Sequence, residues 1–283
     1  MVSSELQNGD VPGLRKGLHV LDLLARHDGL TMAEIQRHSG LNKTMAFRIL
    51  RTLREQGYVR HDAKTHRFTP SFKLMELGAS VAAQLNVVKT GQPFLEELRL
   101  SFGETANLAV LEDDAVVYVG IAESSYRGLR MSSRVGGRDH LHSTSVGKAI
   151  LAFLPDERRD DILNRLELPA ITPNTITNRS QLQEEILRTR ERGFAIDNGE
   201  NEDGARCVGV PILEREGAPI AAISISAPNG RINDDLVVRI ADALWSTSEE
   251  ISQQLGYNIP AHSLQSPSRA EAVDQGRTEV KRD

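Results

Sequence analysis

The sequence predicts an α+β protein: an N-terminal winged helix-turn-helix, a linker helix, and a second domain of mixed helices and strands. Residues 31–56 are typical of two short helices joined by a tight turn, and beyond residue 100 strand-like and helical segments alternate. The charged residues also distinguish the two parts of the chain, with a change near residue 73. Residues 14–73 hold 12 Lys and Arg against 5 Asp and Glu, whereas residues 74–260 hold 18 against 28. A chain of 283 residues is long enough for two domains.

The segment TMAEIQRHSGLNKTMAFRILRTLREQ, residues 31–56, predicts both short helices. Thr31 and Glu34 have the spacing of a capping box, so the first helix starts there. Gly40 can turn the chain at low steric cost, and Asn42 is a suitable cap for the second helix. A narrow apolar stripe at helical spacing predicts the buried face of this helix: Ala46, Ile49, Leu50 and Leu53.

The opposite face of the second helix is basic, which favours docking in the major groove of DNA. After Gly57, residues 58–60 and 66–68 predict two strands around a turn at 62–65, which would form a wing. An ordinary helical bundle with a solvated basic face is the alternative, but cap, turn, stripe and wing agree on DNA binding. The residues expected to contact double-stranded operator DNA are Asn42, Lys43, Thr44, Phe47, Arg48, Arg51, Lys64 and Arg67.

Composition narrows the class of protein. Hydrophobic residues make up 39% of the chain, enough for a real core. The single cysteine excludes an internal disulfide framework and fits a reducing cytoplasm. No apolar run approaches the roughly 20 residues needed to span a bilayer, and the first 13 residues lack a hydrophobic signal region. We expect a soluble cytoplasmic protein without membrane association, whose basic module attracts phosphate although the net charge is −5.

The pattern also predicts where the domains lie. Residues 13–27 have helical spacing and are expected to pack behind the helix-turn-helix, and residues 72–99 are helical with an interruption near 91–93. The first part of that long segment would connect the domains and could pair with a copy of itself. The expected limits are a flexible arm at 1–12, the winged helix-turn-helix at 13–73, the linker helix at 74–90, the second domain at 91–257 and a disordered tail at 258–283.

In the second domain, strands are flanked by helices at both ends, which favours an α+β sheet over a doubly wound one. Asp234 and Asp235 are expected to cap the final helix, which runs to residue 255. Strands are predicted at residues 105–112, 115–123, 129–135, from 194 onward, 205–213 and 219–227, and helices at 145–153, 156–166 and 180–192.

Several polar residues lie on apolar elements of this domain. Ser224 and Ser226 alternate along one strand, so their side chains share a face. Cys207 lies on the neighbouring strand, and Asp197 is placed in the loop before it. The helix starting at residue 145 offers backbone N–H groups that favour an anion. These groups either converge on a small acid or are isolated residues on solvent-facing strands.

Two further functions remain open at this point. Cys207 with Asp197 and either His140 or His142 could form a nucleophile triad that processes a small acid, although a thiol in the middle of an apolar strand is usually buried and inert. The His-x-His pair has no further spaced ligands, and SVGKA alone is no phosphate loop, so neither a metal nor a cofactor is expected. A DNA-compacting scaffold that needs no ligand is the third possibility.

The layout resembles the IclR family of bacterial transcriptional regulators across residues 13–257. In the first half the matching segments are GLRKGLHVLDLLA and GLNKTMAFRILRTLREQGYV. In the second half they are GLRMSSRVGG, HSTSVGKAILAFL, GFAIDNGENEDGARCVGVPI and PIAAISISAP. The resemblance implies a winged helix-turn-helix joined to a GAF-like effector domain, and dimers or dimers of dimers on palindromic operators.

The resemblance also implies an effector site for a small organic or aromatic carboxylate. Its expected residues are Ser145 and Val146 at a helix start, the polar positions Asp197, Cys207, Ser224 and Ser226, and an apolar wall of Gly128, Met131 and Ala205. Ser145 and Ala205 depart from the commoner residues of the family and alter the shape of the pocket. Asn42 and Phe47 differ from the family's commoner choices in the recognition helix. The resemblance leaves repression and activation both open.

Overall fold

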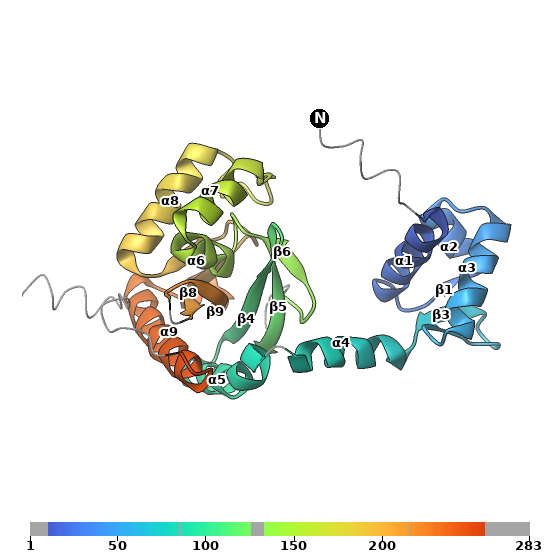
Figure 1. Cartoon of the computed structure of the whole chain (residues 1–283), viewed down its shortest axis with the longest axis horizontal. Coiled ribbons are helices and arrows are strands. Elements are labelled where there is room, and N and C mark those ends of the chain that lie inside the picture. Colours follow the sequence, from blue (N-terminus) through green and yellow to red (C-terminus); the bar gives the residue numbers. More distant parts are fainter. Residues whose placement is uncertain (1–10, 85, 126–132, 215, 258–283) are drawn as a thin grey trace, which may run out of the picture. The chain divides into compact units, whose positions relative to one another are not determined.

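The computed structural model of the protein describes residues 11–84, 86–125, 133–214 and 216–257. It divides into two compact units, one ending at Gln84 and the other starting after it (Figure 1). The predicted flexible arm, apart from the start of the first helix, and the predicted disordered tail lie outside the described residues. None of the helices described is long and apolar enough to cross a membrane.

The first unit combines helices with a small antiparallel sheet of strand order β1-β3-β2. Its core is formed by buried residues of α1, α2, α3 and the sheet, such as Leu24, Ile35 and Leu50. Its elements are α1 (Pro12–Ala25), β1 (Leu30–Thr31), α2 (Met32–Ser39), α3 (Lys43–Glu55), β2 (Val59–His61), β3 (Arg67–Pro70) and α4 (Phe72–Gln84).

The predicted helix signals of this unit are confirmed. Thr31 and Glu34 form the capping box, with Thr31 N–H donating to the Glu34 carboxylate at 2.8 Å. Gly40 ends α2 with a φ of 68°, a conformation that few other residues adopt without strain. The Asn42 side chain accepts a hydrogen bond from Met45 N–H at 2.9 Å and so starts α3. The expected stripe faces the core.

The wing is also confirmed. The turn between β2 and β3 is closed by Asp62, whose carboxylate accepts hydrogen bonds from Lys64 N–H and the Thr65 hydroxyl, both at 2.8 Å. These bonds lower the pKa of Asp62. The short strand β1, which has no clear sequence pattern, pairs Leu30 with Phe68 of β3. The wing is therefore hydrogen-bonded to the segment that starts α2.

The long helical segment differs from its prediction. It forms two helices, but the interruption expected near residues 91–93 is wrong, because α5 runs through Pro93. Proline removes one hydrogen bond from a helix interior, at a cost of about 3 kcal/mol. Packing offsets this cost: Leu95 is fully buried, and Gly91 lies so close to β4 that a Cβ there would be 3.0 Å from Leu108. Tertiary packing overrides the local signal.

The second unit contains, among the residues described, a six-stranded antiparallel sheet of order β6-β5-β4-β9-β8-β7. The antiparallel pairing confirms the predicted α+β class. Its elements are α5 (Asn86–Phe102), β4 (Thr105–Glu112), β5 (Ala115–Ala122), β6 (Arg138–His140), α6 (Ser145–Phe153), α7 (Asp156–Arg165), α8 (Arg179–Arg192), β7 (Ala195–Asn198), β8 (Ala205–Leu213), β9 (Pro219–Pro228), the short 3-10 helix η2 (Asn229–Arg231) and α9 (Asp234–Gln254).

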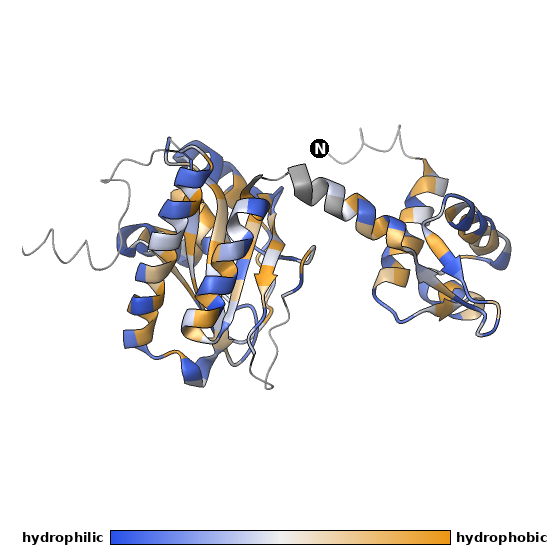
Figure 2. Cartoon of the chain, turned by 90° about the horizontal axis from the view of Figure 1, so that it is seen from below, coloured by the Kyte–Doolittle hydropathy of each residue, from blue (hydrophilic) through white to orange (hydrophobic). Residues whose placement is uncertain are grey.

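Helices cover both faces of this sheet (Figure 1). Helices α5 and α9 bury one face, where Ile223 and Ile225 of β9 belong to the same apolar cluster as Trp245 of α9. Helices α6, α7 and α8 cover the other face with a second apolar cluster that includes Ile150 and Ile186. Figure 2 shows hydrophilic and hydrophobic residues on the outer helices of this unit, as expected of helices with one face against a core, whereas α6 is buried almost throughout.

Two details of the second unit correct the predictions. The strand expected at residues 129–135 lies mostly outside the described residues, and its described end is not a strand; instead β6, in the segment expected to be a loop, pairs with β5. Gly136, with a φ of 78°, allows the turn and donates its N–H to Tyr118 O. The last helix is capped by Asn233, whereas Asp234 and Asp235 lie in its first turn, where carboxylates favour the helix dipole.

Candidate functional site

The predicted DNA-contacting residues of the first unit lie on α3 and the wing. All of them except Arg67 are exposed to solvent: Asn42, Lys43, Thr44, Phe47, Arg48, Arg51 and Lys64. Part of Arg67 is occupied inside the unit, because its Nη1 donates to Gly29 O at 2.6 Å and lies 3.5 Å from the Glu34 carboxylate. Arg67 thus braces the wing against α2. The contacts of these residues with DNA remain predictions.

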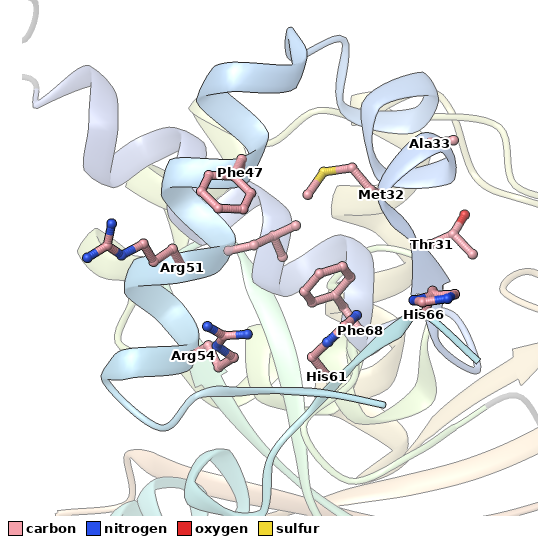
Figure 3. Close-up of a pocket in the computed structure, with 10 residues that line it drawn as sticks. Thr31, Met32, Ala33, Phe47, Arg51, Arg54, His61, His66 and Phe68 are labelled. Atoms are coloured by element: carbon pink, nitrogen blue, oxygen red, sulfur yellow. The ribbon is translucent and has the colours of Figure 1, made fainter. Parts of the chain in front are cut away.

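A groove of about 400 Å³ lies between α3, the start of α2 and the wing (Figure 3). Its inner wall is apolar and its outer side chains are basic or imidazole. In the wing, His61 stacks on Phe68 with ring centroids 4.4 Å apart. The lining residues are Thr31, Met32, Ala33, Phe47, Leu50, Arg51, Arg54, His61, His66 and Phe68.

Strand alternation assembles a second, polar cavity on the α6 side of the large sheet. Ser224 and Ser226 face away from the apolar core of α5 and α9, as the alternation predicts. Cys207 of β8 is registered directly opposite Ser226, and Asp197 opposite Cys207. Asp197 lies on strand β7, so its expected place in a loop is wrong. Its backbone pairs with β8, while the loop begins after Asn198.

A glycine brings the start of α6 to this cavity. A Cβ on Gly209 of β8 would lie 2.9 Å from the backbone of Ser145, so only glycine permits the approach. The Thr144 hydroxyl caps α6 by accepting the Gly147 N–H at 3.1 Å. The first turn of α6, whose N–H groups have no partner within a helix, therefore faces the sheet at Ser145.

An amide that sequence reasoning missed joins the two serines. Asn107 of β4 donates from Nδ2 to the Ser224 hydroxyl at 3.2 Å and to the Ser226 hydroxyl at 3.1 Å. Its Oδ1 accepts from the Ser133 hydroxyl at 3.0 Å. A buried polar residue in the apolar strand TANLAVLE was the available signal. Asn107 lies behind these serines and does not itself line the cavity; the lining residues absent from the prediction are Tyr118, Ser133, Asp139, Thr144, Asn201 and Glu202.

The cavity is acidic. Asp197 Oδ1 accepts hydrogen bonds from the N–H groups of Glu200, at 2.7 Å, and Asn201, at 3.3 Å. Burial nevertheless raises the pKa of Asp197 to about 7, and burial also raises the pKa of Asp139. Carboxyl groups line the cavity, and among its described lining residues there is no lysine or arginine. Near neutral pH, Asp197 therefore exists in both protonation states.

The residues proposed for a nucleophile triad are not assembled. Cys207 is buried, which raises the pKa of its thiol well above the usual value and keeps it protonated. His142 instead hydrogen-bonds to Pro169 O at 3.1 Å, His140 is exposed, and neither lines the cavity in the part of the chain described. That part also holds no group of three or more Cys, His, Asp or Glu side chains arranged to bind a metal.

Not every predicted effector residue reaches the cavity. The Val146 side chain packs into the apolar cluster beneath α6, so only its backbone N–H, the group on which the prediction rested, is left for an effector. Ala205 is buried in the sheet opposite Pro228 without lining the cavity. Gly128 and Met131 lie outside the described residues. The cavity therefore contains Ser145, Asp197, Cys207, Ser224 and Ser226 of the predicted set.

Comparisons with known proteins cover both units. The family "IclR helix-turn-helix domain" matches residues 13–63, and "Bacterial transcriptional regulator IclR C-terminal" matches residues 79–253. The chain is 32% identical over 252 residues to the HTH-type transcriptional regulator KdgR of Dickeya chrysanthemi, across 89% of this chain and 82% of that protein. It is 31% identical over 258 residues to the transcriptional repressor IclR of Escherichia coli K12, across 90% and 94%.

A solved structure shows the same fold. The Thermotoga maritima IclR matches with a TM-score of 0.75 and 34% identity, over 86% of this chain and 98% of that one. These relatives are transcriptional regulators, so the protein is a DNA-binding regulator of transcription and not an enzyme. The resemblance and the fold class predicted from the sequence are confirmed. The chain belongs to the IclR family of bacterial transcriptional regulators.

Proposed function

We propose that a small organic carboxylate, bound in the polar cavity of the second unit, controls the binding of this regulator to its operator. The observation that carries the proposal is the convergence of Ser224, Ser226 and Asp197 beneath the first turn of α6. Buried polar groups without a stabilising role are costly, so a cluster of them in one cavity favours a ligand site.

The chemistry of the cavity suits a carboxylate in a specific way. The N-terminus of α6 favours negative charge, and the hydroxyls of Ser224 and Ser226 can donate hydrogen bonds. Asp197 would repel an anion when it is ionised, but its pKa of about 7 allows a proton to be held there. A protonated Asp197 donates a hydrogen bond to an effector carboxylate, and two carboxyl groups that share one proton avoid the repulsion.

The cavity also supplies a reason for coupling. Its described lining encloses only about 20 Å³, close to the space that one water needs. An effector of several heavy atoms therefore binds a wider form of the unit than the one described. A ligand shifts an equilibrium only as far as its affinities for the two forms differ, and an effector too large for the described cavity would favour the wider form.

On the DNA side, we propose that Lys43, Thr44, Phe47, Arg48 and Arg51 enter the major groove while Lys64 meets phosphate. Two copies would occupy half-sites one helical turn, or a multiple of it, apart. The exposed apolar side chains of α4, Phe72 and Met75, favour association with a second copy. Sedimentation of the full chain checks this: a monomer at micromolar concentration would contradict it.

The test of the proposal is a binding titration of the full chain on its own upstream intergenic DNA at fixed salt, with and without a panel of small carboxylic acids. Specific binding that one acid weakens or strengthens at least tenfold is the expected result. Specific binding that no acid alters would contradict the effector proposal and leave the DNA assignment in place.

Matched variants separate the two sites. Arg48→Ala removes an exposed guanidinium from α3, and Arg158→Ala removes one from α7 of the second unit. Only Arg48→Ala should lose operator binding, by tenfold or more, since a good base contact is worth about 1–3 kcal/mol. Ser224→Ala should show the opposite pattern, with normal operator binding and a weakened response to the acid. Equal operator affinity of both arginine variants would remove Arg48 from the DNA contact.

A further inference from the structure

An aromatic ring stands among the cations of the proposed recognition helix. Phe47 is the fifth residue of α3, and 58% of its surface is exposed. Lys43, Arg51 and Arg54 lie four residues before it and four and seven residues after it, so they share its face of the helix. A single exposed apolar side chain is common on protein surfaces. Phe47, however, is surrounded by cations on the helix that we propose enters the major groove, so its exposure calls for an explanation.

The ring forms part of the groove between α3, α2 and the wing. In Figure 3 it extends from α3 towards Met32, with Arg51 on the same helix below it. Leu50 and Phe68 continue the apolar wall, and the basic or imidazole side chains lie beside it. An apolar surface beside cations suits the major groove of DNA, where an apolar group on a base edge lies between the two phosphate backbones.

The chemistry of the ring limits what it can recognise. Phenylalanine has no hydrogen-bond donor or acceptor, so it cannot distinguish bases by their polar edges. In the major groove, the apolar feature that the four standard base pairs present is the C5-methyl group of thymine. We infer that Phe47 contacts a thymine methyl in each operator half-site and thereby sets part of the sequence specificity. The inference depends on the proposed placement of α3 in the major groove.

The expected size of this contact follows from the area buried. Removing one methyl group from an apolar contact lowers affinity about fourfold per half-site. Two copies on a palindromic site would lose about 15-fold when both methyl groups are removed. Replacing thymine by uracil makes this change alone, because the two bases have identical hydrogen-bonding edges.

The experiment has two stages. Duplexes are first selected from a randomised pool by the wild-type full chain, which defines the site. Each thymine of that site is then replaced by uracil, singly and as the symmetric pair, and affinities are measured for wild type, Phe47→Ala and Phe47→Leu. Uracil at thymines outside the half-sites is the control. Because Phe47 is exposed, the variants should fold, and circular dichroism checks this.

At one symmetric pair of positions, uracil should weaken wild type about 15-fold, weaken Phe47→Leu by a smaller factor and leave Phe47→Ala unchanged. Wild-type affinity that no uracil substitution alters would overturn the inference and keep α3 as the recognition helix. A uracil effect that persists in Phe47→Ala would assign the methyl contact to another residue. If wild type selects no motif, the placement of α3 in the groove fails together with the inference.

Discussion

The two units display their candidate residues in opposite ways. In the first unit all of them except Arg67 project from one helix and one turn into solvent, where even the ion pair of Arg51 with Glu55 stays exposed. In the second unit they are buried side chains from β7, β8 and β9, and each polar atom there must be matched by another. Substitution of an exposed residue at the first site should therefore change binding alone, whereas substitution at the second site should change binding and stability together.

The largest expected effect is the loss of stability when the buried positive charge of Lys148 is removed. Lys148 of α6 is fully buried, with its Nζ 2.6 Å from the Glu200 carboxylate and 3.8 Å from that of Glu185. Lys148→Met leaves a carboxylate unpaired in the interior, which should lower the free energy of unfolding by about 3–5 kcal/mol. Urea denaturation measures this loss. Burial already raises the pKa of Glu200, so the loss should become smaller as the pH falls and Glu200 takes up a proton.

The double variant Lys148→Met with Glu200→Gln is the control. It removes both charges and should recover most of the stability, since a buried ion pair replaced by neutral residues of similar volume is often close to neutral. Arg158→Ala, an exposed cation, should change stability by less than about 0.5 kcal/mol. If Lys148→Met cost no more than Arg158→Ala, the contrast between buried and exposed sites would be wrong.

A smaller effect is expected from Asp197→Asn, and it depends on pH. The pKa of Asp197 is about 7 in the folded unit and near 3.9 in an unfolded chain, so folding strengthens proton binding. Its contribution to stability is fully present below about pH 4 and is lost as pH rises through 7. Asparagine keeps the oxygen that accepts the Glu200 and Asn201 N–H groups and removes the titration.

As the pH rises from 5 to 8, the unfolding free energy of the variant should therefore increase relative to that of the wild type. Comparing the two chains cancels the other raised carboxyls, such as Asp139. A constant difference in unfolding free energy across this range would show that Asp197 does not titrate there. Effector affinity should fall above pH 7 in wild type for the same reason, because a bound carboxylate favours protonated Asp197.

The same contrast explains what the sequence could predict. The signals of the first unit are local: Thr31 and Glu34 are three residues apart, Asn42 is next to the helix that it caps, and the apolar stripe repeats within a few turns. Because these contacts join residues that are close in the sequence, a sequence pattern can predict them. Phe47 and Arg48 could be placed on the exposed face for the same reason.

The cavity of the second unit depends on contacts across the chain. Asn107 meets Ser224 only because β4 and β9 pair in one register, although the two residues are 117 positions apart in the sequence. A shift of one residue would turn every side chain to the other face, and no local pattern determines that register. Alternation alone was enough to place the two serines together. Pro93 failed as a helix breaker because packing, which a sequence pattern does not contain, outweighs it.

Within the first unit, the capping box offers a moderate test of local structure. Thr31→Ala should lower the free energy of unfolding by about 1 kcal/mol, since it removes the side chain that accepts the Glu34 N–H. The main cause of the lowered pKa of Glu34 is the Thr31 backbone N–H, which the variant keeps, so this pKa should move only part of the way back towards its ordinary value. Thermal unfolding and carboxyl titration by NMR measure the two effects. Thr31→Ser, which keeps the hydroxyl, should lose little of either.

The smallest expected effect is at the tip of the wing. Lys64 is exposed in the turn between β2 and β3, so Lys64→Ala should leave stability unchanged. If its ammonium meets a phosphate, the variant should bind operator and unrelated duplexes more weakly by a similar factor, because phosphate contacts carry no sequence information. The slope of log affinity against log salt should also become shallower by about 0.9 for each phosphate that the variant no longer neutralises. An unchanged slope would place the wing away from the DNA backbone, and base contacts by α3 would then account for the binding.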